Sequence, residues 1–212
     1  IAVVILFGLL SGIVMVPLIF HLDSRVPGDP SYAPDYYHFH WNLWWVRHAL
    51  SSGQNLWYTD MALAPFTHNL TYHSLTPSLL PVYALFEPLL GHLPTANLII
   101  WASFTVTGAL MVALLRREGS SRPVAVLGGL ALAFSPYMLD HAANSHLNLL
   151  TVFWLPLVLL LWKQTASTGQ MRWAVLTGLV LTALRGGLTG VARRQGVKTA
   201  SRFCRGGSGQ VA

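Results

Sequence analysis

The sequence predicts an all-α fold, namely a polytopic transmembrane protein of about five spans with interfacial helices in a long first extracytoplasmic loop. The chain is 53% hydrophobic but only 9% charged, whereas a soluble domain usually carries about 25% charged residues. Its apolar residues form long uncharged blocks instead of alternating with polar ones. The single cysteine, Cys204, excludes a disulfide framework and a cysteine-based zinc site.

Five apolar blocks follow one another along the chain. Two of them, 1–20 and 96–115, reach the roughly 20 residues that a span requires. Two more, 123–139 and 147–162, approach that length, and the last, 173–184, falls short of it. The first block has neither a basic region before it nor an A-x-A-like cleavage site, so we favour a transmembrane helix over a signal peptide there.

The charges of the short loops predict which ends of the spans share a side. The loops RREGSSR (116–122) and KQTASTGQMR (163–172) carry excess cations, which is typical of cytoplasmic loops. The turn 140–146 and the long stretch 21–95 then lie outside. This arrangement places all nine histidines and all five aspartates on one face of the membrane, so we expect the chemistry at the outer face.

The segment 74–91 is apolar but contains three prolines and Glu87. If it crossed the bilayer, one loop would lie on the side that its charge disfavours. Each proline removes a backbone donor and tends to kink a helix. We therefore expect an interfacial or re-entrant helix here.

The stretch DYYHFHWNLWWVRHAL (35–50) predicts an amphipathic helix lying in the membrane interface. Helical spacing puts an aromatic stripe on one side, and Trp and Tyr favour the headgroup level. We expect Gly53 to cap this helix at its C-terminal end. The stripe comprises Tyr37, Trp41, Trp44, Trp45 and His48.

This helix is either only an interfacial anchor or the support of a polar site. For the site, Asp29 or Asp35 is the candidate general base at the membrane surface. Either of them, together with His38 and His40, could hold a divalent metal ion. Two residues that are two positions apart in a helix diverge by about 200°, so a metal site requires a non-helical start.

The second outer turn lies within FSPYMLDHAANSHLN (134–148). Asp140, His141 and His146 are found where one predicted span leaves the membrane and the next enters it. They are either further site residues or ordinary polar residues that end the helices.

The order of these parts resembles the C-type superfamily of membrane glycosyltransferases (GT-C). In that superfamily a first transmembrane helix is followed by a long outer loop with an acidic motif and juxtamembrane helices. The segment 1–184 is similar to the N-terminal part of multi-pass bacterial proteins of this type. The motifs that carry the resemblance are PGD…DYYHFHWNLWWVRHAL, YTDMALAPFTHNLTYHSLTP and AFSPYMLDHAANSHLNLLTVFWLPL.

The resemblance implies transfer of a sugar from a polyprenyl-phosphate donor to an acceptor at the extracytoplasmic face of the bacterial inner membrane. Asp35 or Asp29 would be the base, and Asp140 matches a second acidic position only loosely, because no DxD or DNE motif surrounds it. The negative charge of the leaving phosphate would be compensated by Arg, His or a metal ion. The candidates on this chain are Arg47, His141 and His146.

The segment 185–212 differs from the rest of the chain, because it holds six cations, no acid and seven of the glycines. Without it the chain has seven cations and seven acids, so the formal charge of +6 does not indicate a nucleic-acid partner. We expect a frameshifted or truncated end, which would make the chain an inactive fragment. A basic disordered tail, compatible with a cytoplasmic juxtamembrane segment, is the alternative.

Two other functions compete with the transferase. A transporter or flippase of lipid-linked sugars would place ionisable residues within the spans, and apart from Glu87 in the segment 74–91 the predicted spans contain none. A non-catalytic membrane scaffold would use the aromatic helix only as an anchor.

Overall fold

The computed structural model describes residues 1–28, 35–73 and 75–183. This part of the chain is mostly helical, which confirms the all-α class. Its strands are limited to the two-residue β1 (Tyr58–Thr59) and β2 (His68–Asn69), which pair antiparallel with Tyr58 opposite Asn69. Asp29 and the basic segment 185–212 lie outside the described residues.

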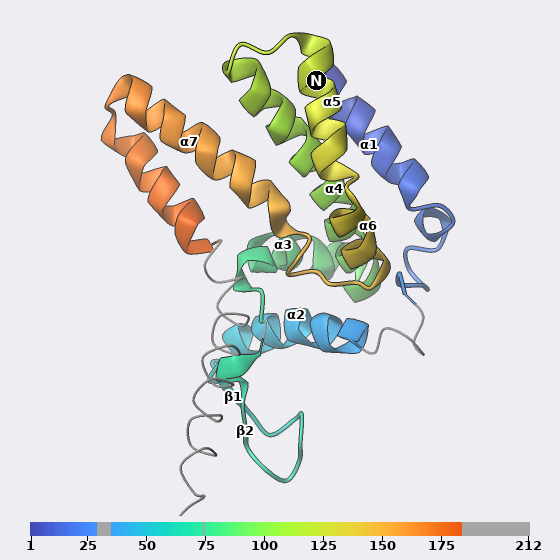
Figure 1. Ribbon diagram of the computed structural model, residues 1–212. Coiled ribbons are helices and arrows are strands. Elements are labelled where there is room, and N and C mark those ends of the chain that lie inside the picture. Colours follow the sequence, from blue (N-terminus) through green and yellow to red (C-terminus); the bar gives the residue numbers. More distant parts are fainter. Residues whose placement is uncertain (29–34, 74, 184–212) are drawn as a thin grey trace, which may run out of the picture.

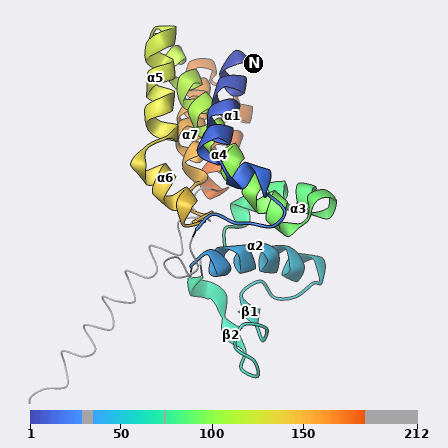
Figure 2. The same ribbon diagram turned by 90° about the vertical axis from the view of Figure 1, so that its right-hand side faces the viewer.

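The helices form a bundle, and α2 and α3 lie across one end of it (Figures 1 and 2). Figures 1 and 2 both show α1, α4, α5 and α7 side by side, with α2 lying across the end of the bundle and the β-hairpin beyond it. The helices are α1 (Ala2–Val14), α2 (Asp35–Ser51), α3 (Leu80–Leu90), α4 (His92–Arg117), α5 (Arg122–Ala133), α6 (Pro136–Ala143), α7 (Trp154–Thr168) and a last helix Met171–Ala183. Short 3₁₀ turns occupy Leu18–Phe20, Leu70–Tyr72, Pro77–Leu79 and Thr151–Phe153.

Two of the described helices are long and apolar enough to cross a membrane. One is His92–Arg117, with a mean hydropathy of 2.2, and the other is Arg122–Ala143, with 1.3, which counts α5 and α6 together. The other predicted spans form shorter helices, since α1 has 13 residues and α7 has 15. Length and composition therefore support two of the five predicted spans.

The predicted boundaries shift at α6 and α7. Ser135 accepts a hydrogen bond from the backbone N–H of Met138, and Pro136 occupies the first turn, so a new helix starts where α5 ends. The predicted outer turn 140–146 is thus helical as far as Ala143. The helix α7 begins only at Trp154, after a 3₁₀ turn, and continues to Thr168. Most of the loop predicted at 163–172 is therefore helix.

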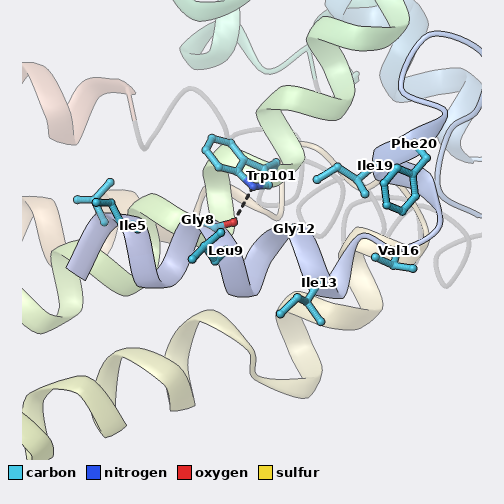
Figure 3. Close-up of a pocket in the computed structure, with 10 residues that line it drawn as sticks. Ile5, Gly8, Leu9, Gly12, Ile13, Val16, Ile19, Phe20 and Trp101 are labelled. Carbon is cyan, nitrogen blue, oxygen red and sulfur yellow. Dashed lines mark hydrogen bonds between the residues drawn. The ribbon is translucent and has the colours of Figure 1, made fainter. Parts of the chain in front are cut away.

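The centre of the bundle is the contact of α1 with α4 and α5. The buried ring of Phe7 occupies the space that glycines leave open, because a Cβ on Gly108 would lie 2.1 Å from it and one on Gly129 would lie 2.8 Å from it. The indole N–H of Trp101 donates to the carbonyl of Gly8 at 3.0 Å, beside an apolar groove of about 700 Å³ along α1 (Figure 3). Glycines on all three helices thus set how closely these helices approach.

The two basic loops lie together at one end of the bundle. Lys163 on α7 pairs with Glu118, which follows α4, and Arg117 donates to the hydroxyl of Ser167 at 3.1 Å. The helices α2, α3 and α6 lie at the opposite end in Figures 1 and 2. This geometry agrees with the prediction that the two loops share a side and that the histidine-rich segments occupy the other end.

Candidate functional site

The helix α2 supports the polar end of the molecule and forms as its sequence predicts. It ends where Gly53 adopts a φ of +64° and the N–H of Gln54 donates to the carbonyl of Ala49 at 2.8 Å. This is the 6→1 bond of a glycine C-cap, which confirms the predicted cap. On the aromatic stripe, the ring of Trp44 stacks on His48 at a centroid distance of 4.8 Å.

Three consecutive residues of α2 contact three different segments of the chain. The ring of His38 stacks on His73 at 4.7 Å, and the ring of Phe39 meets His146 edge-on at 5.4 Å. The ring of His40 approaches His92, the first residue of α4. Because successive residues of a helix point about 100° apart, α2 is held on three sides at once.

A chain of hydrogen bonds connects α2 to α3 and α4. The buried hydroxyl of Tyr83 lies 2.6 Å from His92 Nδ1, and His92 Nε2 lies 3.0 Å from His40 Nδ1. If the Tyr83 hydroxyl is to have an acceptor here, it must donate to His92. In that arrangement His92 carries its proton on Nε2 and donates a hydrogen bond to His40 Nδ1.

Burial sets the protonation states of His40 and Tyr83, the two ends of this series of hydrogen bonds. Burial, together with the neighbouring His92, lowers the pKa of His40 to about 4, so this ring is neutral at physiological pH. Burial raises the pKa of Tyr83 to about 12, although the charge of Arg47 acts in the opposite direction. His40 Nε2 is buried and has no hydrogen-bond partner among the described residues.

Arg47, a candidate phosphate-binding residue, forms an ion pair with Glu87 on α3. The side chain of Arg47 is 35% exposed and that of Glu87 is 18% exposed, so the pair is partly shielded from water. The pair joins α2 to the segment expected to be interfacial, whose helix α3 has 11 residues and contains Pro88. The positive charge of the guanidinium is therefore already partly balanced within the chain.

The turn after α6 brings three of the sequence-predicted residues together. His141 Nδ1 lies 2.9 Å from His146 Nδ1 and 3.8 Å from the Asp140 carboxylate, whose side chain is 70% exposed. The buried Asn148 follows, and its side-chain oxygen has no hydrogen-bond partner among the described residues. A cavity of about 280 Å³ adjoins α6 and is lined there by Leu139, Ala142 and Ala143.

The candidate base Asp35 is the first residue of α2. It precedes Phe39 by four residues, which is one helical turn, and Phe39 contacts His146. The helix α2 and the turn after α6 therefore meet at Phe39, one helical turn after Asp35. Asp29, the other candidate base, lies outside the described residues.

The structure places the two histidines of the predicted metal site against different segments of the chain. Both His38 and His40 are helical, and each contacts a different segment, namely His73 and His92. Among residues 1–28, 35–73 and 75–183, no group of three or more His, Cys, Asp or Glu side chains has the arrangement of a metal site.

Sequence reasoning did not single out Tyr83 and His92 or anticipate the partner of Arg47. The signal available was weak, since Glu87 is the only carboxylate in its apolar segment and His92 follows Gly91 at the start of a long apolar helix. Comparison with known proteins adds no assignment, because no family model, curated protein or solved structure matches the chain.

Proposed function

We propose that the protein is a GT-C-like membrane glycosyltransferase of about five spans in the bacterial inner membrane. In this proposal it transfers a sugar from a polyprenyl-phosphate donor to an acceptor at the extracytoplasmic face. The observation that supports it best is the contact of α2, one helical turn after Asp35, with the turn that holds Asp140, His141 and His146. A candidate base and candidate phosphate-binding groups thus come from distant parts of the chain to one end of the bundle.

The reaction assigns a different role to each group. A carboxylate, Asp35 or Asp29, takes the proton of the acceptor hydroxyl. The acceptor oxygen bonds to the anomeric carbon of the sugar while the bond from that carbon to the phosphate oxygen breaks, and its electron pair leaves with the phosphate. N–H groups of His141 and His146, with Arg47, stabilise the negative charge that develops on the phosphate. Asp140, whose carboxylate lies 3.8 Å from His141 Nδ1, is the second acidic group of the proposed site.

The test is sugar transfer by membranes that contain the full-length protein. Radiolabelled sugar on undecaprenyl phosphate is the donor, and the labelled acceptor fraction is counted. We expect Asp35→Asn or Asp29→Asn to lower the rate by at least 100-fold, because a general base contributes about 10²–10⁴-fold. Asp140→Asn should have a smaller effect on the rate.

The matched control is Asp60→Asn, which alters an exposed aspartate at the hairpin in the same way. It should transfer sugar at the wild-type rate. Unchanged transfer in both Asp29→Asn and Asp35→Asn would remove the proposed base. If no variant altered any measurable phenotype, the scaffold hypothesis would replace the transferase.

The flippase alternative is less well supported. Its expected mark is an ionisable group inside a span. Glu87, the only such candidate in the sequence, is on the short helix α3 and pairs with Arg47 of α2.

A further inference from the structure

An apolar groove separates α4 from α7 at the end of the bundle that carries the basic loops. Its volume is about 420 Å³. Leu114 and Leu115 line it from α4, and Leu159, Trp162 and Ala166 line it from α7. Within α7 these residues recur at a spacing of three or four, so they form one face of that helix. The Lys163–Glu118 pair closes the groove at its polar edge.

The surroundings of the groove are strongly cationic. Besides Lys163, the helix ends and loops here carry Arg116, Arg117, Arg122 and Arg172, and Glu118 is the only acid among the described residues of these segments. Arg116 and Arg117 each donate one hydrogen bond, to the carbonyl of Ser120 and to Ser167. A guanidinium has five N–H donors, so most of their donors have no partner among residues 1–28, 35–73 and 75–183.

The exposed residues of the groove suit a lipid at headgroup depth. The Trp162 ring is 60% exposed and Leu159 is 38% exposed. Tryptophan favours the depth where hydrocarbon meets headgroup, and basic pockets between transmembrane helices bind anionic headgroups. A protein segment covering this surface would have to bury several cations against one carboxylate, and burial of unpaired charge is costly.

We propose that the groove between α4 and α7 binds one anionic phospholipid of the surrounding bilayer. One acyl chain lies against Leu115, Leu159 and Trp162, and the phosphate is held by Lys163 with the adjacent arginines. This inference takes α4 as membrane-spanning and does not depend on the glycosyltransferase activity. It gives the basic end of the bundle a binding role in addition to its role in topology.

The test is native mass spectrometry of the full-length protein, released from detergent micelles that contain equal amounts of phosphatidylglycerol and phosphatidylcholine with matched acyl chains. We expect the wild-type protein to retain one phosphatidylglycerol with a several-fold preference. Lys163→Gln should reduce that preference, and Ala166→Trp, which fills the groove, should abolish retention. Leu127→Trp is the control, since it adds the same ring at a 63% exposed position of α5.

Two results would overturn the proposal. One is equal retention of the two lipids by the wild-type protein. The other is unchanged retention in Ala166→Trp, which is expected if another segment of the full-length chain fills the groove.

A second measurement tests the lipid site even if Ala166→Trp does not fold. Phosphatidylglycerol with brominated acyl chains should quench wild-type tryptophan fluorescence more than it quenches Trp162→Phe. Brominated phosphatidylcholine should give a smaller difference between these two proteins. Equal quenching of both proteins by the anionic lipid would count against the site.

Discussion

At the scale of single residues, His40 lies in an environment that disfavours its charged form. Its ring is only 7% exposed, its Nδ1 lies 3.0 Å from His92 Nε2, and its Nε2 has no hydrogen-bond partner among the described residues. Burial of such a ring favours its neutral form. The contact between α2 and α4 therefore depends on a histidine that remains unprotonated well below its usual pKa.

The lowered pKa of His40 predicts a loss of stability in acid. The unfolded chain binds a proton at His40 near pH 6.5, whereas the folded protein does so only near pH 4. Between these values the unfolded state holds more protons, so the free energy of unfolding falls as the pH falls. From the two pKa values, the loss at pH 4 is on the order of 3 kcal/mol.

The variant His40→Asn isolates this effect. Its amide oxygen can still accept from His92, but the side chain does not titrate. Thermal unfolding followed by tryptophan fluorescence should show a smaller decrease in Tm between pH 7 and pH 4.5 than for the wild type. Parallel pH profiles for the two proteins would show that His40 is not responsible.

The Arg47–Glu87 pair predicts an energetic coupling between α2 and α3. Removing one partner leaves the other charge partly buried, which destabilises the protein more than removing both. In a cycle of Arg47→Met, Glu87→Gln and the double variant, we expect a coupling of about 1 kcal/mol in the free energy of unfolding. Additive effects of the two substitutions would mean that the pair contributes nothing to stability.

The same variants test the proposed role of Arg47 in the reaction. Glu87→Gln leaves the guanidinium without its carboxylate partner and so makes it more available to a phosphate. The KM for the lipid-phosphate donor should fall in Glu87→Gln and rise in Arg47→Met. An Arg47 with only a structural role would give similar KM values in both variants.

At the scale of elements, the contact of Phe7 with α4 and α5 depends on glycine. Gly108→Ala would bring a Cβ to within 2.1 Å of the Phe7 ring, and overpacking of this kind costs about 1–3 kcal/mol. Thermal unfolding of the full-length protein in detergent should show a clear decrease in Tm. Gly178→Ala is the control, because nothing lies within 4 Å of its added Cβ, and it should leave Tm unchanged or raise it slightly.

The elements that could be predicted are those with a local signal. The aromatic spacing of α2 and the glycine that ends it predicted that helix and its cap. The prolines of 74–91 predicted an interfacial or re-entrant helix, and a helix of 11 residues forms there. The start of α6 was missed, although Ser135 and Pro136 are ordinary start signals, because they lie inside a continuous apolar run. The late start of α7 was missed as well, although Pro156 lies in its first turn, because this proline also lies inside a long apolar run.

At the scale of the whole molecule, the separation of charge predicts a definite topology. With Cys204 replaced by serine, a membrane-impermeant maleimide applied to intact cells should label Asp60→Cys in the hairpin but not Ser120→Cys in a basic loop. Permeabilised cells should show labelling at both positions. Labelling of Ser120→Cys alone would invert the proposed orientation, and recovery of the protein in the soluble fraction would exclude a membrane protein.

The candidate site could be predicted only in part, because some of its contacts join residues that are far apart in the sequence. The charge of the loops placed the histidine-bearing segments at one end, because that signal is a sum over many residues. The contact of His40 with His92 joins positions 52 residues apart, and nothing local in the sequence specifies such a pairing. The pairing of Arg47 with Glu87 is of the same kind.

The contacts of His38, Phe39 and His40 have a mechanical consequence. A helix held at three points around its circumference cannot turn about its own axis at one point alone. A molecule that displaces His146 would therefore apply a torque to α2 through Phe39, and the same rotation would separate His38 from His73 and His40 from His92. Binding of a molecule at the turn after α6 would thus be transmitted, as a rotation of α2, to the segment around His73 and to the first turn of α4.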